Sequence, residues 1–130
     1  MLTVLPRLDN LRKRSILQFL YESNLIVRDK PIVDLNGADW SHANLHRANL
    51  REASFWMSYL DYADLSHTDL QKADLRGSLL KGADLSFANL FIADLSDADM
   101  TGVQGIPIEE LEKKARSLKG PTMRDGSKHP

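Results

Sequence analysis

The stretch ADLSHTDLQKADLRG (residues 63–77) repeats one pattern three times: a small residue, then Asp or Asn, then Leu, then two variable residues. Read in the same frame, this pattern runs without a break from residue 33 to residue 102, which makes fourteen units. Asp or Asn occupies the second position in eleven of the fourteen, and Leu, Trp, Phe or Met occupies the third position in all of them. More than half of the chain therefore follows one repeat, and that repeat decides the fold.

A period of five residues fits neither an α-helix nor one long strand. In a helix, steps of five residues would advance by about 140° around the axis and spread the leucines over every face. In a strand, an odd period would send successive leucines to opposite faces. The small residue and the Leu of one unit are two positions apart and point the same way if that part is extended, so the other positions must turn the chain. The repeat therefore predicts a coil with Leu and Ala inside.

The unit resembles the signature of the pentapeptide-repeat family, Ala-(Asp/Asn)-Leu-X-X, over the whole of residues 33–102. This resemblance implies an all-β solenoid, namely a right-handed quadrilateral β-helix with four units per coil and therefore about 3.5 coils. The segments at residues 11–23 and 117–130 are similar to the flanks of cyanobacterial members of the family. Many of those relatives are of undefined function, so the resemblance indicates a lineage more than an activity.

We expect a single domain with three segments: an N-terminal helical cap (residues 1–32), the fourteen repeats (33–102), and a C-terminal helix and tail (103–130). An open β-helix exposes apolar interior and unpaired backbone groups at each end, so a helix at either end is expected to act as a cap.

The first of these helices is predicted at residues 9–23, with Asp9 or Asn10 as its N-cap. Its apolar side chains fall on one arc: Ile16, Leu17, Phe19 and Leu20. The second is predicted from an apolar stripe followed by a Gly120-Pro121 stop. Its first turn is acidic and its last turn is basic. The residues concerned are Ile108, Leu111, Ala115 and Leu118 in the stripe, Glu109 and Glu110 at the start, and Arg116 and Lys119 at the end.

Composition narrows the function classes. The absence of cysteine excludes disulfides, thiol catalysis and thiolate metal sites. No apolar run reaches the ~20 residues of a membrane span, and no signal peptide is recognisable, so we expect a cytoplasmic protein without membrane insertion. The repeats hold eleven acidic and five basic residues, whereas both flanks are basic. An acidic column argues against direct nucleic-acid binding, which requires a basic face.

Residues that could carry chemistry have structural explanations. The Asp series could be read as acid–base pairs or a cation site, but Asn44, Asn49 and Asn89 occupy the same position. A short side chain that accepts a turn N–H group explains both residue types. His46 and His67 have no third ligand placed to complete a metal site. No Ser-His-Asp set, phosphate loop or Cys-His cluster is present. We therefore expect no enzyme, no catalytic residue, no metal and no cofactor.

Outward positions that break the pattern are candidates for a contact surface, because exposed aromatic patches often mark interfaces. The first candidate patch has Leu79 in place of an Asp, directly above an aromatic residue, and consists of Trp56, Met57, Tyr59, Tyr62 and Leu79. The second candidate patch consists of Phe87, Phe91 and Ile92. The terminal segments, a second copy of the chain or another protein could cover them, and the sequence leaves these possibilities open.

Together these features predict a non-catalytic protein-interaction or scaffold module with an unknown protein partner or with itself as partner. The resemblance suggests an alternative, because some pentapeptide-repeat proteins mimic duplex DNA and modulate a topoisomerase such as gyrase. The acidic column is compatible with that alternative, but about 3.5 coils with basic ends are short for it.

Overall fold

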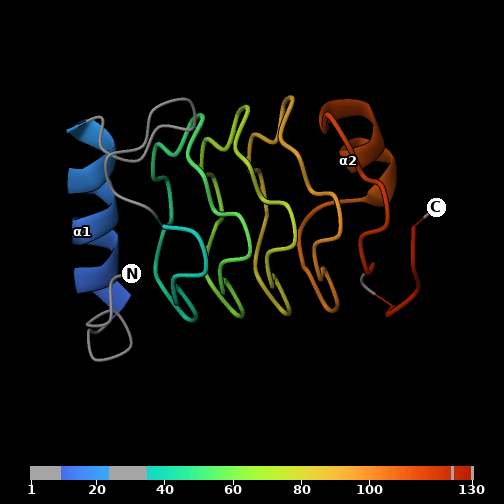
Figure 1. Ribbon diagram of the computed structural model, residues 1–130, viewed down its shortest axis with the longest axis horizontal. Coiled ribbons are helices and arrows are strands. Elements are labelled where there is room, and N and C mark those ends of the chain that lie inside the picture. The colour runs from blue at the N-terminus through green and yellow to red at the C-terminus, as the bar shows by residue number, and fades with distance from the viewer. Residues whose placement is uncertain (1–9, 24–34, 124, 130) are drawn as a thin grey trace.

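The computed structural model describes residues 10–23, 35–123 and 125–129 of the chain. Two helices occur in these residues, α1 (Asn10–Glu22) and α2 (Ile108–Lys114). Between them the chain winds into a column, with α1 at one end and α2 at the other (Figure 1). The first two residues of the predicted repeats, 33 and 34, lie outside the described residues, so the number of coils stays a prediction, as do the segment boundaries.

Parallel bridges join residues that lie twenty positions apart, such as Asn44 with Asp64 and Asp64 with Asp84. The backbone N–H of Leu65 donates to the carbonyl of Asp84 at 2.9 Å, and the N–H of Asp84 donates to the carbonyl of Ala63 at 3.0 Å. Each coil therefore takes four units, and corresponding sides of successive coils stack. Bridges of one residue pair at a time replace longer strands in the described repeats.

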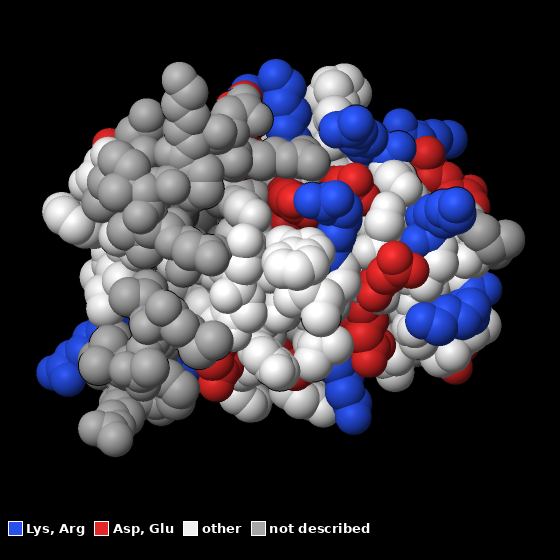
Figure 2. Space-filling view, in the orientation of Figure 1, with Lys and Arg blue, Asp and Glu red and all other residues white. Residues whose placement is uncertain are grey.

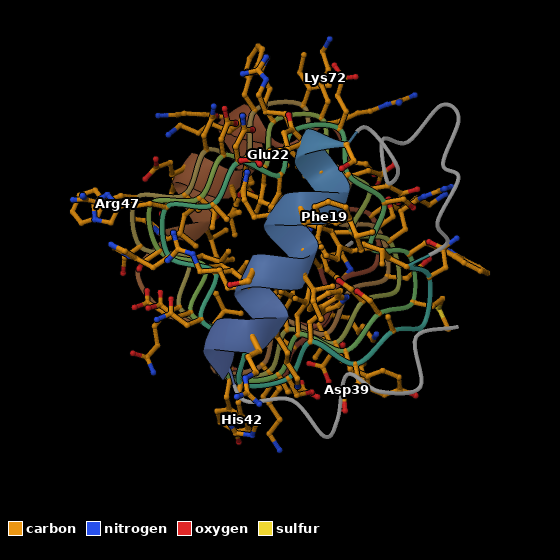
Figure 3. The ribbon with its side chains drawn as sticks, turned by 90° about the vertical axis from the view of Figure 1, so that its left-hand side faces the viewer. Phe19, Glu22, Asp39, His42, Arg47 and Lys72 are labelled. Atoms are coloured by element: carbon orange, nitrogen blue, oxygen red, sulfur yellow. The ribbon has the colours of Figure 1, made fainter. Side chains whose placement is uncertain are left out.

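The coil is right-handed. Figure 3 looks along the column from the α1 end, and Asp39, His42, Arg47 and Lys72 follow one another clockwise as the chain recedes from the viewer. A clockwise path that moves away from the viewer is a right-handed one. The four residues belong to different sides or corners of the coil, and their side chains point away from the column.

Every unit turns sharply after its Leu. The N–H of Ala63, for example, donates to the carbonyl of Leu60 at 3.1 Å. The third residue of each turn has a left-handed backbone, with φ between 57° and 71° in all fourteen units from Gly37 to Gly102. Turns that need a positive φ at this position favour glycine, yet ten of the fourteen residues carry side chains. The ladder above and below each corner holds these side chains in a conformation that costs about 1–2 kcal/mol in isolation.

The interior is made of the third and first positions of the units. Leu50, Leu70 and Leu90 are completely buried, one above another. At some first positions a hydroxyl replaces the methyl of Ala without leaving an unpaired polar group. The hydroxyls of Ser58 and Thr68 donate to the carbonyls three residues earlier at 2.7 and 2.6 Å. The same bond therefore makes Ser or Thr compatible with a closed apolar core.

α1 lies across the end of the column (Figure 3). Leu17 and Leu20 are buried, and Lys13 is buried beside them with its Nζ donating to the carbonyl of Ser41 at 3.0 Å. The prediction that Phe19 belongs to the buried arc is wrong, because its side chain is 63% exposed. At 3.6 residues per turn, Phe19 lies roughly 130° from the middle of the arc that Lys13, Leu17 and Leu20 form. The predicted N-cap, Asp9 or Asn10, falls outside the side chains that are described.

The predicted extension of the second helix to Lys119 is also wrong, because α2 ends at Lys114. The following residues resume the ladder instead. The N–H of Leu95 donates to the carbonyl of Ser117 at 3.1 Å, and the N–H of Met100 donates to the carbonyl of Thr122 at 2.6 Å. The last regular coil would otherwise end in unpaired backbone groups, and these bonds satisfy them. The interior positions of this added segment are Leu118 and Met123, which are buried and five residues apart.

Candidate functional site

The structure places the first patch on one side of the column. Tyr59 and Leu79 are bridge partners in the middle of that side, Trp56 and Met57 form the corner before it, and Tyr62 forms the corner after it. Trp56 is 47% exposed, Met57 51%, Tyr59 44% and Tyr62 54%, while Leu79 is half-buried. Four large side chains that are so exposed on one side form a contiguous apolar surface.

Glycines in the next coil make room for two of these side chains. A Cβ atom on Gly77 would lie 2.5 Å from the Sδ of Met57, and one on Gly82 would lie 2.5 Å from Cε1 of Tyr62. Met57 and Tyr62 therefore occupy the room that these glycines leave. On its other side the Tyr62 ring stacks on the His42 ring, with centroids 5.3 Å apart and planes 12° apart. Two side chains of the first patch are thus packed against residues of the adjoining coils.

Charged residues of both signs border the first patch. Asp61 precedes Tyr62 and accepts the backbone N–H of Lys81 at 3.0 Å. Arg76 donates from Nε and Nη2 to the carboxylate of Asp74 at 2.8 and 2.7 Å. These hydrogen bonds, followed by the charge of Asp74, raise the pKa of the Arg76 guanidinium. In Figure 2, uncharged side chains fill the middle of the side turned to the viewer, and charged side chains of both signs crowd the part nearer α2.

The second patch lies on the opposite side of the column, half a coil away. Phe87 and Phe91 stand at the two corners of the side that carries Asn89, and Ile92 follows Phe91. Phe87 is 80% exposed and Phe91 49%. The Phe87 ring stacks on His67, with centroids 4.8 Å apart. Because Asn89 separates the two Phe corners, this surface is less continuous than the first patch.

The structural role predicted for the Asp series is confirmed. In ten of the described units the Asp or Asn side chain accepts the backbone N–H two residues later, at 2.9 to 3.4 Å. Asn44 and Asn89 make the same bond as Asp64 and Asp84. The repeated carboxylates are therefore turn acceptors, and their regular spacing needs no catalytic explanation.

A chain of hydrogen bonds that the sequence did not reveal joins an Asp, a Ser and a His. The Ser66 hydroxyl donates to Oδ1 of Asp64 at 2.5 Å, and Nδ1 of His46 lies 2.7 Å from Ser66 Oγ. Since the single hydroxyl proton points at Asp64, the proton of the second bond belongs to His46 Nδ1. The imidazole therefore does not activate the serine, and this order differs from that of a nucleophilic triad. Within the described residues, no three His, Cys, Asp or Glu side chains form a group suited to a metal ion.

Comparison with known proteins identifies the family. The family model "Pentapeptide repeats (8 copies)" matches residues 33–61, 58–91 and 68–103. Because these ranges cover more than half of the chain, the chain belongs to the pentapeptide-repeat family. No curated protein matches the chain. Neither helix in the described part of the chain has the length and apolar character needed to cross a membrane.

Three solved structures of pentapeptide-repeat proteins are similar to this chain. HetL, a pentapeptide repeat protein involved in heterocyst differentiation regulation from the cyanobacterium Nostoc sp. strain PCC 7120, is 36% identical, with a TM-score of 0.67 over 78% of this chain and 45% of HetL. Rfr23 from the cyanobacterium Cyanothece 51142 is 37% identical, with a TM-score of 0.48 over 75% of this chain and 63% of Rfr23. A pentapeptide repeat protein of the Arabidopsis thaliana thylakoid lumen is 30% identical, with a TM-score of 0.42 over 69% of this chain and 61% of its own. The chain thus spans less than two thirds of the length of each.

Proposed function

We propose that this chain is a non-catalytic protein-interaction module. A column of about 3.5 coils, with α1 and α2 as end caps, presents the first patch to a partner protein. The observation that carries the proposal is the exposure of Trp56, Met57, Tyr59 and Tyr62, each between 44% and 54%, side by side on a hydrogen-bonded ladder.

The energetics of such a surface favour contact. Burial of a large apolar side chain contributes about 1.5–3 kcal/mol, and Trp and Tyr are over-represented among the residues that dominate interfaces. Ladder bonds fix the backbone on both sides of the patch, as when Tyr59 N–H donates to Ala38 O at 3.0 Å and Leu79 N–H to Ser58 O at 2.9 Å. A surface that is already ordered loses little conformational entropy on binding.

The likeness to HetL supports a regulatory contact. HetL is involved in the regulation of heterocyst differentiation. A protein can regulate by contact alone, without chemistry on a substrate. In this chain, the described carboxylates at the second position of the units act as turn acceptors, so we infer for it a role of the same kind, exerted by binding.

Site-specific photo-cross-linking in the source organism tests the proposal. A photoreactive phenylalanine analogue replaces Tyr62 in one strain and Gln71, on another side of the column, in a control strain. We expect a cross-linked protein with the first analogue that is lost when Trp56→Ser and Tyr59→Ser are added. Identical cross-links from both positions, or from the double variant, would contradict a role for the first patch.

A gyrase supercoiling assay separates this proposal from topoisomerase modulation. A contact module of the kind proposed leaves supercoiling unchanged at micromolar protein. Inhibition that persists in the Trp56→Ser/Tyr59→Ser variant would instead favour the acidic column as the active surface, because those substitutions do not alter its charge.

A further inference from the structure

We infer that the partner of the first patch is a second copy of this chain, bound face to face with the two columns antiparallel, about a two-fold axis that lies in the plane of the interface, passes between Tyr59 and Leu79 and runs across the column. This inference rests on the proposed function, because it names the partner of the same surface. It follows from how charge and side-chain size are distributed over that side of the column.

That side consists of two unlike halves. The half nearer α1 carries large side chains at both of its corners and a carboxylate at one of them. The half nearer α2 carries a glycine at both corners, each preceded by a cation. The residues are, in the first half, Trp56 and Met57 at one corner and Asp61 and Tyr62 at the other, and, in the second half, Arg76 and Gly77 at one corner and Lys81 and Gly82 at the other.

This axis sets each half against the partner's other half and each corner against the partner's same corner, and in such an interface every contact occurs twice. Asp61 of one copy then faces the partner's Lys81. The same operation sets Trp56 against the partner's Arg76, an arrangement that suits a cation over an indole ring. In the middle, Tyr59 packs against the partner's Leu79. Opposite charges, a cation and an aromatic ring, and two apolar groups thus meet in register.

The surface is large enough for this arrangement. Met57 and Tyr62 lie against Gly77 and Gly82, where any larger residue would collide with them. A stable interface of standard size buries about 800 Å² on each partner. This is roughly an eighth of the chain's accessible surface of 6860 Å², and one side of a four-sided column offers that share.

One pair of like charges disfavours this dimer. The axis brings Asp39 opposite the partner's Asp99, which are like charges. Both carboxylates accept an N–H group of their own chain, Asp39 from Ser41 at 2.9 Å and Asp99 from Thr101 at 3.0 Å. They lie at the outer edges of the paired side, where solvent screens them. A two-fold contact of this kind also closes on itself, so it leaves the second patch, on the opposite side, outside the dimer.

Sedimentation velocity of the full chain across about 1 to 300 µM tests the assembly. We expect a concentration-dependent dimer. Tyr59→Glu, which sets a carboxylate against the partner's Leu79, should raise the dissociation constant at least about tenfold. The matched control is Phe91→Glu, the same kind of change on the second patch, which should leave the dimer intact. A monomer throughout the range, or a dimer that Tyr59→Glu does not weaken, would overturn the inference.

A charge reversal tests the symmetry itself. Asp61→Lys places two cations together in each of the two symmetry-related contacts and should weaken the dimer at least about tenfold. Addition of Lys81→Glu to the same chain restores an opposite-charge pair and should recover most of the loss. Thermal melts verify that each variant is folded, since the Asp61 carboxylate also accepts the backbone N–H of Lys81 within the chain. A double variant no tighter than Asp61→Lys would show that these residues do not face each other.

Cross-linking distinguishes failure of this inference from failure of the proposed function. The chain has no cysteine, so a short bismaleimide should join two copies of Leu79→Cys and not two copies of Phe87→Cys. If Leu79→Cys does not cross-link to itself while the Tyr62 photo-cross-link to another protein depends on Trp56 and Tyr59, self-association fails and the interaction module stands. If dimers persist unchanged in Trp56→Ser/Tyr59→Ser and no photo-cross-link depends on the first patch, both fail.

Discussion

A leucine at the third position of a unit packs against the residues twenty positions before and after it. Leu70, with Leu50 and Leu90 in that relation, is completely buried. Leu70→Ala should lower the free energy of unfolding by about 2–5 kcal/mol, because it leaves a cavity between two fixed layers. Urea unfolding measures this change, with Lys72→Ala at an exposed corner as control. A Leu70→Ala variant as stable as that control would mean that the residue does not face the core.

The turn acceptors can be tested apart from their charge. The carboxylate of Asp84 accepts the N–H of Ser86 at 2.9 Å and its hydroxyl at 2.6 Å. Asp84→Asn keeps an acceptor oxygen and should be nearly neutral, whereas Asp84→Leu should cost about 0.5–2 kcal/mol, the usual effect of a lost cap. Thermal unfolding compares the two. Equal losses would give the negative charge a role that the hydrogen bonds do not explain.

One of these acceptors predicts a pH dependence. The hydroxyl of Thr101, and then its backbone N–H, donate to Asp99 and hold the pKa of that carboxyl below its usual value. A pKa lowered by folding stabilises the protein above the unfolded value of about 3.9, and this stabilisation is lost as the pH falls through the folded value. Asp99→Asn should therefore reduce the fall in melting temperature between pH 5 and pH 2. Thr101→Val, which removes the first donor, should reduce it partly. An unchanged acid profile in both variants would contradict this account.

At the level of elements, the spacing of apolar residues predicted which faces are buried but not where each helix ends. The five-residue frame determines which side of the column each repeat residue occupies, so the grouping of the first patch could be predicted from numbering alone. The end of α2 could not, because backbone groups at the open end of the column compete with the helix for residues 116–122. The spacing of five between Leu118 and Met123 is the signal that could have revealed it.

Side-chain conformation is the second feature that could not be predicted from the sequence. The frame places Tyr62 at a corner, but the stacking of its ring on His42 and its position over Gly82 depend on torsion angles that spacing does not determine. Phe19 shows the converse error, since it lies at the edge of the arc that the apolar residues of α1 span, whereas the buried face is centred on Leu17 and Leu20.

The segment that leaves the ladder for α2 passes close to the coil beneath it. A Cβ atom on Gly105 would lie 1.9 Å from Oγ of Ser86 and 2.6 Å from its Cα. Gly105→Ala should therefore destabilise the protein by about 1–3 kcal/mol through overpacking. Gly37→Ala is the matched control, because Gly37 also has a positive φ but meets nothing within 4 Å. Thermal unfolding compares the two variants. If both substitutions lower the melting temperature equally, the effect comes from backbone strain and not from the close approach to Ser86.

At the scale of the whole molecule, the core has no break between α1 and the column. One cluster of buried residues runs from Leu17 of α1 through the repeats to Leu118. Trp40 is completely buried in the first coil, beside the carbonyl of Ser41 that Lys13 of α1 binds. Each coil contacts its neighbours, and an array this short is expected to unfold in a single step.

Trp40 provides the probe for this expectation. In Trp56→Phe, the exposed tryptophan is removed and Trp40 alone reports on the end of the column covered by α1. Its fluorescence and the far-ultraviolet circular dichroism should then give the same urea midpoint, because loss of α1 would expose the interior of the first coil and with it the whole ladder. Lys13→Met, which removes the bond to Ser41, should lower both midpoints together. A fluorescence transition that precedes the circular dichroism would instead mean that α1 detaches on its own and leaves the remaining coils folded.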